Sequence, residues 1–151
     1  MNKIVDAIIP VYRPGNEFRE LLRRLSNQSY PLNKIILMNT GDAPWRAEIE
    51  KEFPLCEIHL LKKEDFDHGG TRHEATTYSD ADYLLFLTQD ALPNNEFMVE
   101  KLLDAFAQDE KVKAAQDTKP MCRLMVVICQ MIPAVKSKNK QEALIIRRNP
   151  E

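Results

Sequence analysis

The chain has 151 residues, which suits a single domain with one hydrophobic core. Its net charge of -2 argues against a nucleic-acid-binding protein, which would carry a basic surplus. The three cysteines lack metal-type spacing and indicate a reducing compartment rather than a disulfide framework. The N-terminus does not resemble a signal peptide, and the apolar stretch Leu124–Val135 is too short to cross a bilayer. We therefore expect a cytoplasmic protein, and peripheral docking at the inner face of the membrane stays open.

Short apolar segments alternate with amphipathic ones along the chain. We expect strands at Val5–Val11, Lys34–Met38, Glu57–Leu61 and Tyr83–Leu87, and helices at Asn16–Gln28, Pro44–Phe53, Thr71–Ser79 and Asn95–Gln108. Solidly apolar strands that alternate with helices predict an α/β fold, a Rossmann-like and mostly parallel sheet with helices on both faces. The periodicity fades after about Lys111, so we divide the chain into a domain at 1–115 and an aberrant tail at 116–151.

Polar residues follow each predicted strand, at the edge where open α/β sheets bind ligands. The candidate binding residues at this edge are Pro10, Tyr12, Asn39, Gly41, Gly70, Arg72, Gln89 and Asp90. Backbone N–H groups at Gly69-Gly70, before a predicted helix, suit an anion. Arg72 near that helix start would suit a phosphate, because acidic residues are the usual occupants of a first turn.

Each of these features also has a purely structural interpretation. Tyr12 could cover the sheet edge, the run from Asn39 to Asp42 could form an ordinary turn, and Gly69-Gly70 could be a flexible loop. Asp90 could cap a helix instead of binding a cation such as Mg²⁺, which prefers carboxylate and phosphate oxygens.

Four segments together resemble family-two glycosyltransferases, in the order that the family has them. Ile8–Pro14 (IIPVYRP) resembles the first-strand motif, in which Pro and Tyr line the base pocket, and Ile35–Asp42 (IILMNTGD) lies at the pyrimidine-contacting motif. The segment Phe66–Ala75 (FDHGGTRHEA) resembles bacterial rhamnosyltransferase-like members most specifically. Phe86–Pro93 (FLTQDALP) lies where the family has its Asp-X-Asp metal motif. The resemblance covers about residues 4–110.

This resemblance implies the N-terminal half of an inverting enzyme of GT-A fold. It implies transfer of a sugar, with rhamnose suggested by the subfamily, from a nucleotide diphosphate to a glycan or lipid-linked acceptor in cell-surface polysaccharide synthesis. The implied cofactor is a divalent metal, Mg²⁺ or Mn²⁺, with Asp90 as the metal ligand, because Thr88 replaces the first Asp of the motif. Asn39 replaces the Asp that usually contacts the pyrimidine. No segment matches the family's catalytic base, so the catalytic residue is unknown.

The tail contains two family motifs in a different reading frame. A back-translation of Leu124–Pro133 read one nucleotide earlier can encode Ala-Tyr-Gly-Arg-His-Leu-Pro, and the same frame turns Leu144–Arg147 into Phe-Asn-Tyr-Pro. We therefore hypothesise a frameshift before Leu124, and expect an irregular Leu124–Glu151 with at most a local helix near Gln141–Arg147. The alternative is a genuine divergent tail with an apolar strand at Leu124–Ile132.

Two other functions compete with a truncated glycosyltransferase. One is a non-catalytic nucleotide-binding remnant of such an enzyme. The other is a nucleotidyltransferase, which would open with a Gly-rich basic loop, and Arg13-Pro14-Gly15 falls short of that pattern.

Overall fold

The computed structural model describes residues 3–108, 114–115, 123–124 and 142–147. The strands are β1 (Val5–Val11), β2 (Lys34–Thr40), β3 (Cys56–Leu61), β4 (Tyr83–Leu87), β5 (Ala114–Ala115), β6 (Arg123–Leu124) and β7 (Glu142–Arg147). The helices are α1 (Glu17–Ser26), α2 (Arg46–Glu52), the 3₁₀ turn η1 (Lys63–Asp65), α3 (His68–Thr76) and α4 (Met98–Gln108).

The sheet has the order β3-β2-β1-β4-β7-β5, and its first four strands are parallel. Consecutive strands step outward from β1 to β3, and the connection through α3 then returns to place β4 on the other side of β1. Strand β7 continues the sheet beside β4 in the antiparallel sense. The predicted α/β fold with a mostly parallel sheet is confirmed.

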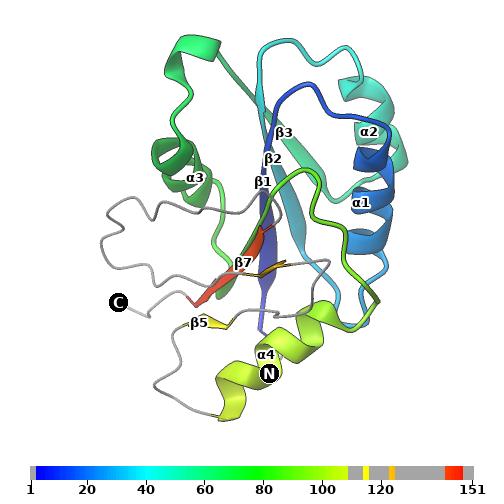
Figure 1. Cartoon of the computed structure of the whole chain (residues 1–151), viewed down its shortest axis with the longest axis vertical. Helices are drawn as coiled ribbons and strands as arrows, with labels where there is room; N and C mark the ends of the chain where they lie inside the picture. The colour runs from blue at the N-terminus through cyan, green and yellow to red at the C-terminus, as the bar shows by residue number, and fades with distance from the viewer. Residues whose placement is uncertain (1–2, 109–113, 116–122, 125–141, 148–151) are drawn as a thin grey trace.

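Side chains of each strand alternate between two apolar layers. Residues such as Ile9, Leu37 and Leu85 face the layer that holds α1, α2 and α4. Ile8, Met38 and Phe86 face the smaller layer beneath α3. Figure 1 shows the sheet between these layers, with α1 and α2 on one side and α3 on the other. Within the described residues, both faces of the sheet therefore carry an apolar layer covered by helices.

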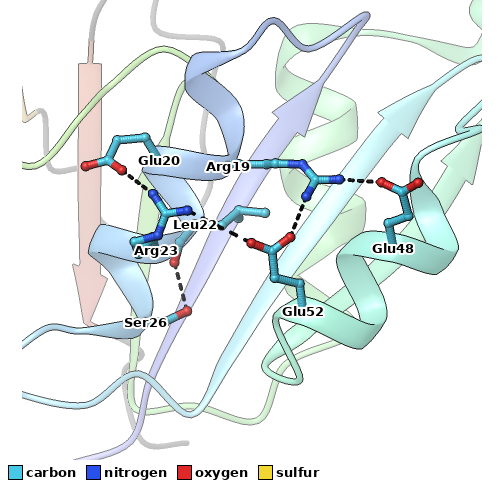
Figure 2. Close-up of polar contacts among 7 residues, drawn as sticks. All are labelled: Arg19, Glu20, Leu22, Arg23, Ser26, Glu48 and Glu52. Atoms are coloured by element: carbon cyan, nitrogen blue, oxygen red, sulfur yellow. Dashed lines mark hydrogen bonds and ion pairs between the residues drawn. The ribbon is translucent and has the colours of Figure 1, made fainter.

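Helix α1 packs through the buried residues Phe18, Leu21, Leu22 and Leu25, which recur at helical spacing. Its outer face meets α2 through ion pairs of Arg19 with Glu48 and Glu52, while Arg23 pairs with Glu20 within α1 itself (Figure 2). These groups are solvent-exposed, so we assign the register of the two helices mainly to their buried face. The asymmetric charge pattern, acidic in the first turn and basic in the last, also favours this helix.

Four sequence expectations about elements are wrong. The residue types predict an N-cap at Asn16 and an apolar helix face that includes Phe97, but the Asn16 side chain does not cap α1 and Phe97 is 45% exposed. Helix α3 begins at His68, three residues before the predicted start at Thr71. Residues Glu142–Arg147 form a strand rather than irregular chain or a local helix. They pair with β4, which no short-range pattern in that segment indicates. Most of the alternative strand at Leu124–Ile132 lies outside the described residues.

Candidate nucleotide-binding site

The carboxyl ends of β1 and β4 border the point where the strand order reverses. Chain connections lead away from this point in opposite directions, and open α/β sheets bind their ligands at such a point. The sequence Pro10-Val11-Tyr12 completes β1 here, and Thr88-Gln89-Asp90 follows β4. The candidate residues from these two segments are thus brought together at one edge, as predicted from their positions after strands.

Pro10 interrupts the hydrogen bonding between β1 and β4. Alternate residues of a parallel strand direct both backbone groups to the same neighbour, and on β1 the even-numbered residues face β4. The Ile4 carbonyl accepts a hydrogen bond from the Tyr83 N–H at 3.0 Å, which fixes this parity. Pro10 has the same parity and no N–H to donate. The backbone ladder therefore lacks a donor one residue before β1 ends.

The Gln89 side chain closes the gap that Pro10 opens. The backbone N–H of Tyr12 donates to Gln89 Oε1 at 2.8 Å, and Gln89 Nε2 donates to the Tyr12 carbonyl at 3.1 Å. The primary amide thus takes the place of a backbone peptide group from β4. Sequence analysis placed Gln89 among the ligand-binding residues, whereas the structure engages both of its amide atoms with the protein itself.

Tyr12 presents its ring at this edge, with the residue 43% exposed. Arg13 follows in a left-handed conformation, at φ 43°, which costs a non-glycine residue about 1 kcal/mol or more. Its guanidinium carbon lies 5.3 Å from the centroid of the Tyr12 ring. Backbone strain of this kind is concentrated at binding sites and active sites. The sequence does not single out Arg13, because only the backbone angle reveals this conformation.

Asn39 is fully buried and shapes the turn after β2. Its Nδ2 donates to the carbonyl oxygens of Gly41 at 2.9 Å and of Asp42 at 3.4 Å. Gly41 adopts φ 83°, a left-handed conformation that glycine favours. The Asn39 amide nitrogen therefore stabilises a turn, as the structural interpretation of this segment predicted. A contact between Asn39 and a nucleotide base stays a prediction.

The carboxylate of Asp67 caps the first turn of α3. It accepts a hydrogen bond from the Gly70 N–H at 2.6 Å. A side chain at Gly70 would bring Cβ within 2.7 Å of the Asp67 carboxylate, so any other residue there would displace this cap. Gly69-Gly70 is therefore part of the helix and not a flexible loop, and an anion bound at these N–H groups stays a prediction. Its position inside the helix corrects the predicted boundary.

Arg72 lies in the middle of α3 instead of its first turn. Its Nη1 donates to the His68 carbonyl one turn earlier, at 2.9 Å. The position of Arg72 in the helix therefore gives no independent reason to expect a phosphate beside it. Helix α3 packs against β1 and β2, so Arg72 belongs to the layer over β1 and not to a remote edge of the sheet. Its convergence with Asp90 stays a prediction.

Asp90 occupies a turn in which the Ala91 N–H donates to the Thr88 carbonyl at 3.1 Å. Helix α4 begins only at Met98, which rules out Asp90 as its cap. The half-buried Asp90 carboxylate makes no hydrogen bond or ion pair within the part of the chain that the structure describes. A carboxylate without a partner at a ligand-binding edge fits the role of a metal ligand.

Two buried hydroxyl groups near this edge also lack hydrogen-bond partners, Thr40 Oγ1 and Thr88 Oγ1. Strand alternation places both on the α3 side, since Met38 and Phe86 lie on that side two residues earlier. No three His, Cys, Asp or Glu side chains gather within residues 3–108 or the other described stretches. A divalent ion would thus depend on Asp90 together with oxygens from its ligand.

Comparison with known proteins agrees with this geometry. The profile described as "Glycosyl transferase family 2" matches residues 6–125. The chain belongs to this glycosyltransferase family. The match contains all four segments that carry the resemblance. It supports a glycosyltransferase over the competing nucleotidyltransferase interpretation.

Two relatives are O-antigen chain rhamnosyltransferases. The chain is 29% identical to RfbN of Salmonella typhimurium over 104 residues, 68% of this chain and 33% of that protein. It is also 29% identical to WbaN of Salmonella anatum over 112 residues, 71% of this chain and 34% of that protein. The chain therefore spans about a third of the length of the curated relatives that it matches.

The fold matches that of a mannosyltransferase, PcManGT from Pyrobaculum calidifontis, solved in complex with GDP-Man and Mn²⁺. The TM-score is 0.65 at 17% identity, over 79% of this chain and 36% of that one. This similarity confirms the predicted N-terminal part of a GT-A fold. Within the described residues, no helix is long and apolar enough to cross a membrane.

Proposed function

We propose that this chain binds a nucleotide-diphosphate sugar and forms the donor-binding half of an inverting glycosyltransferase. The observation that carries the proposal lies at the carboxyl ends of β1 and β4, where the Asp90 carboxylate has no partner among the described residues and Gln89 beside it bonds the Tyr12 backbone. Open α/β sheets bind nucleotides at such a point. The relatives are rhamnosyltransferases, which supports rhamnose as the transferred sugar.

Each residue at the edge has a distinct proposed task. The exposed Tyr12 ring packs against the nucleoside, and Asp90 would hold a divalent cation, Mg²⁺ or Mn²⁺. When bound, such an ion supplies positive charge to the leaving diphosphate. Arg72 contributes a guanidinium to the same diphosphate charge. PcManGT, whose fold this chain shares, was solved with Mn²⁺.

The acceptor reaction needs a base that removes a proton from the acceptor hydroxyl while it attacks the anomeric carbon from the far face. We assign this base to no residue of the chain. The proposed acceptor is a glycan or a lipid-linked saccharide of cell-surface polysaccharide synthesis, because the relatives build O-antigen chains. The proposed location is the cytoplasm, at the inner face of the membrane.

The frameshift is part of this proposal. If Leu124–Glu151 is out of frame, a frame-restored protein carries the rest of the fold, and the gene sequence around codons 110 to 124 decides this directly. A sequence that encodes neither Ala-Tyr-Gly-Arg-His-Leu-Pro nor Phe-Asn-Tyr-Pro in the second frame would reject it.

Transfer assays separate an enzyme from the alternative, a non-catalytic nucleotide-binding remnant. We expect the frame-restored protein to transfer the sugar and this polypeptide to bind the donor without transfer. Donor turnover by the polypeptide itself would show that it holds its own base. Absence of both binding and transfer from each protein would refute the proposed function.

A further inference from the structure

We propose that Gln89 is a positioning residue that fixes Tyr12 for base binding, rather than a residue that contacts the nucleotide. The inference rests on the proposed function, because it assigns the exposed Tyr12 ring to the nucleoside. It arises from the pair of hydrogen bonds between the Gln89 amide and the Tyr12 backbone.

The site needs such a device because β1 and β4 are not joined at their carboxyl ends. The paired register between these strands runs from Val5 opposite Tyr83 to Ile8 opposite Phe86. Beyond it, Pro10 has no donor to direct at β4. The two bonds to Gln89 are thus the connection between the two strand ends at Tyr12, four residues past the last paired position.

Only a side-chain amide of this length satisfies both groups of Tyr12. The amide supplies one acceptor for the N–H and one donor for the carbonyl, as a strand residue would. Glutamate offers no donor at neutral pH, and asparagine is one methylene shorter. Methionine keeps the approximate volume of glutamine and removes both hydrogen bonds.

We call the two hydrogen bonds between the Gln89 amide and the Tyr12 backbone the Gln89 clamp. This clamp also links two parts of the proposed site. Gln89 immediately precedes Asp90, and both lie in the turn closed by the Thr88 carbonyl and the Ala91 N–H. Tyr12 immediately precedes Arg13, whose left-handed backbone directs a guanidinium at the Tyr12 ring. Without the clamp, the segment that carries Tyr12 for the nucleoside can move independently of the turn that carries Asp90 for the metal.

Hydrogen exchange at the Tyr12 amide tests the clamp without any ligand. We expect Gln89→Met to accelerate this exchange about tenfold or more, equivalent to about 1.4 kcal/mol of lost protection. Gln89→Glu keeps an acceptor for the Tyr12 N–H and should fall between the two. Unchanged Tyr12 exchange in Gln89→Met would overturn the clamp.

Nucleotide binding then tests the positioning role through a double-mutant cycle. The resemblance to rhamnosyltransferases suggests a thymidine nucleotide. With thymidine monophosphate as the probe, without metal, we expect Gln89→Met to weaken binding about fivefold, and less than about twofold in a Tyr12→Ala background. The Tyr12 backbone bonds do not need the ring, so the cycle removes only the ring contact. An equal loss in both backgrounds would show that Gln89 contacts the nucleotide itself and would overturn the proposal.

Gln28→Met is the matched control. Gln28 also bridges two segments through its amide, donating to the Asn95 carbonyl at 3.0 Å and accepting from the Val99 N–H at 3.1 Å. It lies outside the candidate edge, so its loss should lower stability without changing Tyr12 exchange or probe affinity. If the unmutated chain binds no probe, the proposed function fails, while Tyr12 exchange still decides whether the clamp exists.

Discussion

Asn39→Asp restores the residue that the resemblance implies at this position, and the structure predicts that the change is harmful. Asn39 is fully buried, and its amide nitrogen donates to two backbone carbonyls. An ionised carboxylate has no donor and would face both carbonyl oxygens. The position therefore favours an amide, even though an acid would resemble the family motif more closely.

The expected loss follows from two contributions. Removing the 2.9 Å bond to Gly41 costs about 1 kcal/mol, and the longer bond to Asp42 adds less. Burying an unpaired charge against carbonyl oxygens adds about 2 kcal/mol or more. We therefore expect Asn39→Asp to lower the free energy of unfolding by about 3 kcal/mol at pH 7.

The charge contribution should depend on pH with a definite sign. Burial raises the folded-state pKa of the introduced carboxyl above its unfolded value of about 3.9, by roughly 1.5 pH units for 2 kcal/mol. Relative stability is then greatest below the unfolded pKa and is lost as pH rises through the folded pKa. The deficit of the variant should grow between about pH 4 and pH 6.

Urea denaturation of both proteins from pH 4 to pH 8 measures this deficit. Asn94→Asp, at an exposed position, is the matched control and should change stability by less than about 0.5 kcal/mol. A stability of Asn39→Asp equal to that of the unmutated chain at pH 7, without pH dependence, would refute the role assigned to the Asn39 amide.

Four further predictions concern the edge and its supports. Asp90→Ala should weaken metal-dependent binding of a nucleoside diphosphate at least about tenfold in calorimetry, and equal affinity would remove Asp90 from the site. Arg72→Ala should weaken nucleoside diphosphate binding more than nucleoside binding, and a uniform loss would contradict charge neutralisation. Gly70→Ala should destabilise the chain or leave it unchanged, because the gain in helix propensity is offset by a displaced Asp67 cap. In an Asp67→Ala background the same change should stabilise the chain by about 1 kcal/mol, and identical effects in both backgrounds would exclude the clash. Burial raises the pKa of the Cys56 thiol to about 12, so alkylation at pH 8 should be slow in the folded chain and fast in urea. Rapid alkylation of the folded protein would contradict that burial.

The strand bounds were predictable where a segment consists mainly of apolar residues. Val5–Val11 and Tyr83–Leu87 match their predicted bounds because apolar residues dominate both segments, apart from the buried Asp6 in β1. Strand β2 extends to Thr40, past the predicted end at Met38, because Asn39 and Thr40 pair with β3 despite being turn-forming types. Pairing with a neighbouring strand outweighed local preference there.

The site was predictable as a set of positions but not as a set of roles. Strand order places Tyr12 and Asp90 at the carboxyl ends of adjacent strands, which the motifs after the strands already indicated. The task of Gln89 depends on a partner 77 residues away, and no spacing along the chain encodes that contact. Asp67 was the exception, since an Asp before a helical segment is a start signal that would have placed α3 correctly.

Calorimetric titration of this polypeptide with thymidine diphosphate, with and without Mn²⁺, decides whether the carboxyl ends of β1 and β4 form a nucleotide-binding site. The account predicts saturable binding that strengthens with the metal, and loss of that metal dependence in Asp90→Ala. Absence of binding under both conditions by a folded chain would contradict the assignment of a nucleotide site to these strand ends.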